Sequence, residues 1–152
     1  DPNAGLTCAE AAKIAAVIHN KSQYEREEIE FQMTGENWYD VYVDYCYDNA
    51  ILEDYIIFDW EENATRAQMA YLFSRCDVNP YFINDVPLND IPDVYDTTPH
   101  AYEILDLYNK GIAVGSDEYM AFYPDSQVKR SEAAALISRI LCYDMRIELP
   151  KG

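Results

Sequence analysis

Three stretches of the chain align with one another without gaps, and this internal repeat limits the possible folds more than any other feature. They are DPNAGLTCAEAAKIAAVIH, DWEENATRAQMAYLFSR and YPDSQVKRSEAAALISRIL, which begin at residues 1, 59 and 123. Thr7, Thr65 and Lys129 take the same place in the alignment, so the motif recurs after 58 and then 64 residues. Such a repeat predicts an array of similar units that stack on their neighbours.

Each aligned stretch is predicted to open an amphipathic helix. In the third stretch, hydrophobic residues recur at spacings of three and four, which places them on one helix face. They are Ala133, Leu136, Ile137, Ile140 and Leu141. The first stretch has the same pattern, so the motif helices are predicted at residues 7–20, 65–76 and 130–142.

The first two motifs carry a signal for the start of a helix. Thr7 with Glu10, and Thr65 with Gln68, have the spacing of a capping box, in which the hydroxyl and the Glu or Gln satisfy free backbone amides. Lys129 stands where the third motif would need a hydroxyl, so a weaker cap is expected there.

A second kind of helix is predicted before each later motif, in residues 38–52 and 99–110. For the latter, Thr98 is the expected N-cap, Pro99 the first helical residue and Gly111 the residue that ends the helix. Together these elements predict an all-α fold with long, turn-rich connectors. The segment 76–96 is such a connector and contains three prolines. Residues 24–33 fit either an extension of the first helix or a short strand.

Composition excludes several functional classes. The chain has 152 residues and a net charge of −17, which argues against nucleic-acid binding because phosphate neutralisation needs a basic surface. No apolar run is long enough to span a membrane. His19 and His100 lie in different segments and no nucleophile–base pair stands out, so the chain is not expected to be an enzyme. The Asp-rich turns lack the ligand spacing of a calcium loop, so no metal or cofactor is expected.

The four cysteines lie in or beside hydrophobic helical patterns. Cys8, Cys46, Cys76 and Cys142 are too far apart in sequence to form a metal-binding motif. Reduced, mostly buried thiols are the prediction. Disulfide bonds stay open as an alternative for an exported protein.

The repeated pattern resembles the S-layer homology (SLH) family, whose members usually carry three tandem repeats. The resemblance is carried by TCAEAAKIAAVIH, TRAQMAYLFSR and KRSEAAALISRIL, which begin at residues 7, 65 and 129. These segments are similar to the family's I-T-R-A-E motif and its following helix. The third repeat also matches at IPDV, HAYEILDLYNKGIAVG and FYPDSQVKRSEAA, so the likeness covers most of the chain.

The resemblance implies a particular architecture, a pseudo-threefold array of helical repeats shaped like a three-pronged spindle. Residues 1–152 would form a single SLH domain, with 1–23 as the second half of the first repeat, 24–80 as the second repeat and 81–145 as the third. The first repeat lacks its leading helix. We expect that helix to have been lost from an upstream segment or to be supplied by another chain.

The resemblance also implies a function. SLH domains hold exported proteins non-covalently on the Gram-positive cell wall by binding pyruvylated secondary cell wall polymers, which are anionic glycans. The chain would then be extracellular, located at the cell surface, and fused to or cleaved from a larger exported protein. Neither nucleic acid nor membrane insertion is expected.

The predicted binding site is built around the motif arginines, Arg66 and Arg130. Basic side chains are disfavoured at a helix N-terminus, so their recurrence suggests that they bind a carboxylate together with free helix amides. The other predicted site residues are Trp38, His100, Tyr123, Asp125 and Gly115. The aromatic residues would pack on the sugar and Asp125 would accept its hydroxyl groups.

Alternatives remain for these residues and for the function. Salt bridges to acidic neighbours would explain Arg66 and Arg130 about equally well, and core packing would explain Trp38 and His100. Cys8 replaces the motif arginine in the first repeat and Lys129 replaces the motif threonine in the third, and these two departures leave the number of binding pockets open. A protein-interaction module, or an accessory domain with a purely structural role, is the alternative function.

Overall fold

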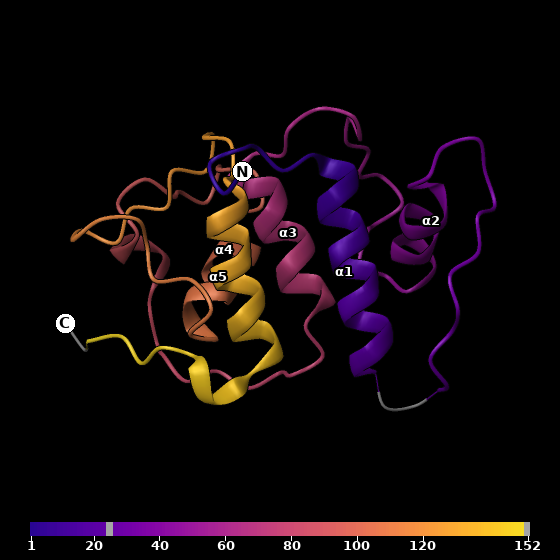
Figure 1. Ribbon diagram of the computed structural model, residues 1–152. Helices are drawn as coiled ribbons and strands as arrows, with labels where there is room; N and C mark the ends of the chain where they lie inside the picture. Colours follow the sequence, from indigo (N-terminus) through magenta and orange to yellow (C-terminus); the bar gives the residue numbers. More distant parts are fainter. Residues whose placement is uncertain (24–25, 151–152) are drawn as a thin grey trace.

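The computed structural model describes residues 1–23 and 26–150, and within them the protein is all-α. The α-helices are α1 (Cys8–Ser22), α2 (Asp40–Asp48), α3 (Arg66–Cys76), α4 (Ala101–Asn109) and α5 (Arg130–Leu141) (Figure 1). Two single-turn 3-10 helices are also present, η1 (Leu88–Asp90) and η2 (Tyr143–Met145). None of the described residues belongs to a β-strand, so the all-α class and the five predicted helices are confirmed. In the same residues, no helix is both long enough and apolar enough to cross a bilayer.

Helix α2 is shorter than the predicted range of 38–52. The backbone amides of Ile51 and Leu52 both donate to the carbonyl of Cys46, at 2.9 and 3.0 Å, and Ala50 has a positive φ of 57°. The chain therefore turns sharply after the helix instead of continuing it. Helix α4 ends with the same arrangement of hydrogen bonds at its corresponding residues.

The predicted start of α4 is wrong. Thr98 and Pro99 lie in the turn before the helix, and His100, with φ 61°, is the residue that precedes the first helical turn. The Thr98 hydroxyl instead accepts a hydrogen bond from the Tyr95 amide at 2.9 Å and so closes that turn. The predicted end is confirmed, because Gly111 follows the helix with φ 72°.

The predicted capping boxes of the first two motif helices are both present. They consist of Thr7 with Glu10 and of Thr65 with Gln68. At the third helix the Glu132 carboxylate accepts a hydrogen bond from the Lys129 amide at 2.9 Å, while Lys129 itself has no hydroxyl to cap the helix. As predicted, the third cap is the weaker one.

Helix α1 packs on α2 and on α3, and α4 packs on α3 (Figure 1). The contact face of α1 is made of small residues: Ala11, Ala12, Ala15 and Ala16 are all fully buried. Small side chains let helices approach closely. The predicted packing between motif helices and the helices that precede the later motifs is confirmed for two pairs, α1 with α2 and α3 with α4.

The turns before α1, α3 and α5 meet at one end of the molecule. The Leu6 amide donates to the Val128 carbonyl, the Val128 amide to Ala64, and the Ala64 amide to Leu6, at 3.3, 3.1 and 2.7 Å. The three hydrogen bonds therefore form a closed ring. Each ring residue directly precedes the aligned motif position of its own repeat, and all three are buried.

The same turns also bind the first amides of the three motif helices. The amides of Cys8, Arg66 and Arg130 donate to the carbonyls of Glu62, Ser126 and Ala4, at 2.9, 2.8 and 3.0 Å. The next amides, of Ala9, Ala67 and Ser131, donate to Trp60, Pro124 and Pro2 at 2.9, 3.0 and 3.0 Å. Each helix thus has its first two amides bonded to the turn of another motif.

A buried group of charges connects the end of α3 to the end of α4 and to the segment after η2. Asp77, whose side chain is 4% exposed, lies 3.4 Å from the Lys110 ammonium and 3.1 Å from the Arg146 guanidinium. Lys110 also lies 3.3 Å from Asp106, which accepts a hydrogen bond from Ser74 at 2.6 Å. Two buried cations therefore share two carboxylates.

Residues 26–33 take neither of the forms predicted for the segment 24–33. Residues 24–25 lie outside the described part of the chain, and residues 26–33 form neither a helix nor a strand. Both polar atoms of the Asn20 side chain bond to the backbone of Ile29, at 2.8 and 2.9 Å. These bonds satisfy backbone groups that would otherwise pair within a helix or strand.

The cysteines lead to a labelling prediction. All four thiols are free, and Cys8, Cys46 and Cys76 are buried. Cys142 is exposed, so the prediction of burial is wrong for this cysteine. Burial, aided at Cys8 by nearby carboxylates, raises the pKa of Cys8 to about 11 and that of Cys46 to about 12. Because the thiolate is the reactive form, a thiol reagent will modify Cys142 rapidly and the other three only on unfolding. Fewer than four reactive thiols in denaturant without reductant would contradict free cysteines.

Candidate functional site

A pocket of about 530 Å³ opens beside the first turns of α1. Its walls come from the first half of α1, from the residues just before α2 and from the turn before α3. Arg130, the first residue of α5, also lines it. Trp38 and Arg130, two of the predicted site residues, therefore share one cavity although they are distant in the sequence.

Aromatic rings form much of the lining. Trp38, Tyr39 and Trp60 all line the pocket, and Trp38 is 45% exposed. The ring of Trp38 meets that of Tyr39 edge to face, with centroids 5.6 Å apart. An exposed indole can pack on an apolar ligand surface while its N–H donates a hydrogen bond.

Lys13 is the second cation of the pocket, and its surroundings differ from those of Arg130. Its ammonium lies 5.5 Å from the ring centroid of Tyr42 and 6.0 Å from that of Trp38. Among the ion pairs formed by residues 1–23 and 26–150, none involves Lys13. Its charge is therefore directed at the aromatic wall and not at a carboxylate.

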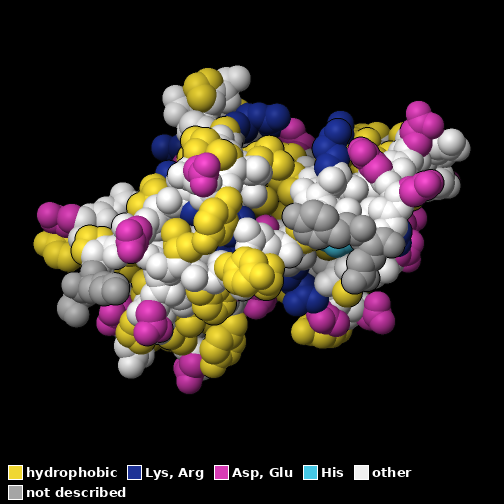
Figure 2. Space-filling view, turned by 90° about the horizontal axis from the view of Figure 1, so that it is seen from below, with side chains coloured by type: hydrophobic (Ala, Val, Ile, Leu, Met, Phe, Trp, Pro, Cys, Tyr) yellow, Lys and Arg dark blue, Asp and Glu magenta, His cyan; other side chains and the backbone are white. Residues whose placement is uncertain are grey.

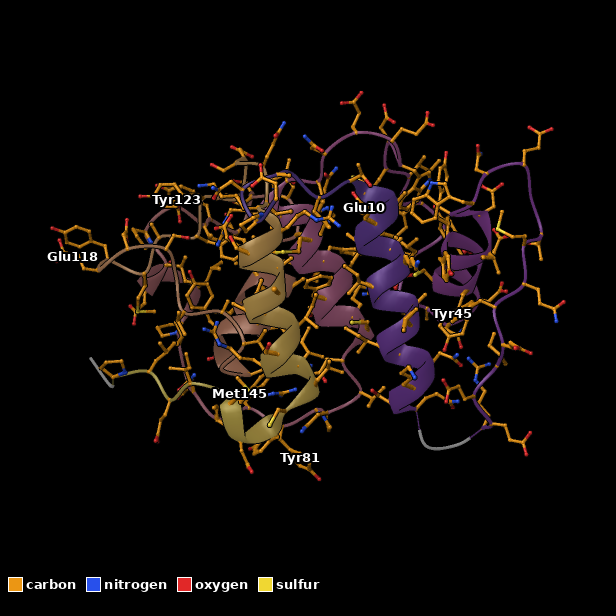
Figure 3. The ribbon with its side chains drawn as sticks, in the orientation of Figure 1. Glu10, Tyr45, Tyr81, Glu118, Tyr123 and Met145 are labelled. Carbon is orange, nitrogen blue, oxygen red and sulfur yellow. The ribbon has the colours of Figure 1, made fainter. Side chains whose placement is uncertain are left out.

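Arg130 is paired with Glu10 across the pocket. One guanidinium nitrogen lies 2.7 Å from a Glu10 oxygen, and the two side chains are 45% and 30% exposed. The other Glu10 oxygen accepts a hydrogen bond from the Thr7 amide at 3.0 Å. Burial opposes the ionisation of Glu10, but the hydrogen bonds from Arg130 and Thr7 outweigh it and lower the pKa of this carboxyl group. Figure 3 shows Glu10 on the first turn of α1.

Arg66 has a different environment from Arg130, although both stand at the motif arginine position. Its side chain is 9% exposed and forms an ion pair with Glu132. Its Nε donates to the Phe122 carbonyl at 2.6 Å, and its guanidinium lies 4.8 Å from the centroid of the Phe122 ring. The salt-bridge alternative therefore describes Arg66 in this structure, and a role for Arg66 as a ligand contact stays a prediction.

Two other cavities are present among the described residues. One, of about 790 Å³, lies between residues 82–90 and 148–150, and none of the predicted site residues lines it. The other, of about 270 Å³, lies beside α5, and it is called the smaller pocket here, in contrast to the larger pocket beside α1. Arg66 and Gly115, which were both predicted as site residues, line the smaller pocket together with Glu132 and Arg139. Gly115 has φ 87°, and a Cβ there would come within 2.5 Å of the Met120 backbone, so glycine is required for this turn. In this cavity Arg66 pairs with Glu132, and the Arg139 guanidinium donates to the Ile112 carbonyl at 2.9 Å.

The three motifs share one rule of side-chain pairing. The first residue of each motif helix bonds to the third residue of another: Arg130 to Glu10, Arg66 to Glu132, and Cys8 to Gln68 at 3.5 Å. Where cysteine replaces arginine, glutamine replaces glutamate. No buried carboxylate is then left without a partner.

The prediction that free helix amides help to bind a carboxylate is wrong. The amides of Arg66 and Arg130, and those of the residues that follow them, already donate to backbone carbonyls of other turns. An anion at either helix start would have to displace these bonds. Side chains must therefore supply the contacts of any acidic ligand.

The remaining predicted residues line none of these three cavities. His100 packs at 4.6 Å between ring centroids on Tyr71, and its side chain is 15% exposed, so core packing describes it. Tyr123 donates its hydroxyl to Asp117 at 2.7 Å, and Figure 3 shows it well away from Glu10. Asp125 is exposed on the surface.

Sequence reasoning predicted only Trp38 and Arg130 of the residues that line the larger pocket. Lys13, Glu10 and Trp60 are among those that it missed. Lys13 is an exposed cation in a helix otherwise rich in alanine, and this contrast was a detectable signal. Glu10 was recognised only as a capping residue. Trp60 stands in the turn before the second motif, where periodicity offers no guide to side-chain direction.

Comparison of the chain with protein-family models and with curated protein sequences finds no match. The function is therefore inferred from the repeated motif and from the residues of the pocket. The most informative residues of the pocket are the exposed Trp38 and two cations, of which Arg130 is paired with a carboxylate and Lys13 faces aromatic rings.

Proposed function

We propose that this protein anchors an exported protein to the Gram-positive cell envelope by binding an acidic glycan, namely a pyruvylated secondary cell wall polymer, in the larger pocket. The observation that carries the proposal is the meeting of Trp38, Lys13 and Arg130 in one cavity of about 530 Å³. The proposed location is the cell surface. The proposed role is binding rather than catalysis.

The chemistry of the pocket suits an acidic sugar. The exposed indole of Trp38 packs on the apolar face of a sugar ring, and Trp60 provides a second aromatic wall. A carboxylate on the same sugar pairs with Lys13 or Arg130 by charge-assisted hydrogen bonds. Glu61, which also lines the cavity, can accept hydrogen bonds from sugar hydroxyl groups.

The proposed architecture is a pseudo-threefold array of SLH repeats. The closed ring of hydrogen bonds through Leu6, Ala64 and Val128 supports it, because the ring residues stand at matching positions of the three motifs. The shared pairing between the first and third residues of different motif helices supports it as well. The larger pocket is then lined by residues of all three proposed repeats.

The acidity of the whole chain does not prevent binding of an anionic polymer. At physiological salt the Debye length is about 8 Å, so remote carboxylates are largely screened. The charges that matter are those that line the cavity. These are Lys13 and Arg130 against Glu10 and Glu61, so the local charge is balanced even though the chain carries −17.

A protein-interaction module is the second candidate function. The observation that favours it is the large number of exposed aromatic side chains outside the pocket. Among them, Tyr55, Tyr81, Tyr102 and Tyr119 are 66–79% exposed. Tyrosine is enriched at protein interfaces because its ring is apolar and its hydroxyl is polar. A protein partner would bind these surfaces independently of the cavity.

Binding to purified native cell wall tests the proposal. Trp38→Ala and Arg130→Ala are each expected to lower the affinity about tenfold or more, since each removes a contact with the ligand inside the cavity. Tyr102→Ala is the matched control, because this exposed aromatic residue lies outside the pocket and its loss should leave binding unchanged. If all three variants bind as tightly as the wild-type protein, the proposal that this pocket binds the glycan is refuted. A loss of binding confined to Tyr102→Ala would favour the interaction module.

A further inference from the structure

The two cations of the larger pocket differ in how free they are to bind a ligand. Arg130 is engaged by the Glu10 carboxylate at 2.7 Å, whereas the Lys13 ammonium faces aromatic rings. Both the Arg130–Glu10 pair and Lys13 lie in the lining. Lys13 and Arg130 are the two cations that could bind the carboxylate of an incoming ligand. Arg130 is already paired with the Glu10 carboxylate when the ligand arrives.

An internal comparison separates the two tasks of Glu10. At the corresponding position of the second motif, Gln68 accepts a hydrogen bond from the Thr65 amide at 2.9 Å, which matches the 3.0 Å bond from the Thr7 amide to Glu10. Glutamine thus caps a motif helix as well as glutamate does. The negative charge of Glu10 is therefore not needed for the cap, and it acts instead in the ion pair with Arg130.

We propose that Glu10 is an internal competitor that sets the affinity and the charge selectivity of the pocket. While the pocket is empty, Glu10 occupies Arg130. Lys13 first receives the carboxylate of an acidic sugar stacked on Trp38, and full binding then draws Arg130 away from Glu10. This inference rests on the proposed function, and it narrows the ligand class. The carboxylate must belong to the sugar that contacts the tryptophan, because the Lys13 ammonium lies 6.0 Å from that ring.

Glu10→Gln tests the proposal, because the variant keeps the cap and removes the competing charge. The probes are soluble fragments of a pyruvylated Gram-positive wall polymer and the same fragments after mild-acid removal of the ketal. Glu10→Gln is expected to bind the ketal-bearing fragments about two- to fivefold more tightly, the factor for a partly exposed ion pair. Its affinity for the ketal-free fragments should not change. Thermal melting checks that the variant is folded.

Lys13 provides the complementary test. Lys13→Gln is expected to bind the ketal-bearing fragments about tenfold more weakly, while Lys13→Arg retains most of the affinity. Weaker or unchanged binding by Glu10→Gln would overturn the role of Glu10, and full binding by Lys13→Gln would overturn that of Lys13. If the wild-type protein binds neither probe, the proposed function itself fails and this inference with it. If wild type binds and both variants resemble it, only the present inference fails.

Discussion

Replacing Arg66 with alanine is expected to lower the free energy of unfolding by about 3–5 kcal/mol, the usual cost of breaking a buried ion pair from one side. The Arg66 side chain is 9% exposed and pairs with Glu132. Its removal also takes a hydrogen-bond donor from the Phe122 carbonyl and a planar group from the Phe122 ring. Urea denaturation followed by circular dichroism measures the change.

Arg130→Ala is the matched control, because Arg130 stands at the same position of the third motif. Its side chain is 45% exposed, and its ion pair with Glu10 is half open to solvent. The expected cost is about 1 kcal/mol or less. Equal losses for the two variants would contradict the distinction drawn here between a structural arginine and one that is available to a ligand.

Replacing Asp77 with asparagine is expected to lower the free energy of unfolding by about 3 kcal/mol or more. Asparagine keeps the shape of the side chain but leaves Arg146, whose side chain is 1% exposed, without its carboxylate. Lys110 retains Asp106 and compensates only in part. The variant should lose stability at both low and high salt, because buried charges are poorly screened.

Asp144→Asn serves as the control for this substitution, since Asp144 lies in η2 close to Arg146 in sequence but is exposed. We expect it to change the free energy of unfolding by no more than about 0.5 kcal/mol. A loss at Asp77 no larger than the loss at Asp144 would show that the buried charges do not hold the end of the chain in place.

The helices could be predicted because their signals are local. Hydrophobic spacing located all five, and the pairs Thr7–Glu10 and Thr65–Gln68 gave the starts of α1 and α3. The start of α4 could not be found in this way, because Thr98 uses its hydroxyl to close the preceding turn. A capping residue and a turn residue look alike in sequence when each bonds to an amide three residues away.

The candidate site could be predicted only in part, because its lining comes from distant segments. The repeated arginine position pointed to Arg66 and Arg130, but only the packing of Phe122 shows that the first is buried. The alignment also could not show that the first backbone amides of the motif helices are hydrogen-bonded, because their acceptors lie in the turns of other motifs. The way in which the turns meet decides which side chains share a cavity. The spacing of residues within one helix carries no information about this arrangement.

Cys8 and Gln68 stand at positions where other motifs have an arginine and a glutamate, and only the structure explains why both differ. In the sequence, Cys8 looked like the loss of a binding residue. In the structure it faces Gln68, in the arrangement that pairs Arg130 with Glu10. The two replacements together remove both charges of one pair, so the fold is kept without an unpaired buried charge.

The most direct test of the account is a calorimetric titration of the wild-type protein with soluble fragments of a pyruvylated wall polymer. We predict saturable binding to the ketal-bearing fragments and affinity at least about tenfold lower for fragments without the ketal, because Lys13 and Arg130 then lose their anionic partner. Equal affinity for both probes, or no binding to either, would contradict the assignment of this pocket to an acidic glycan.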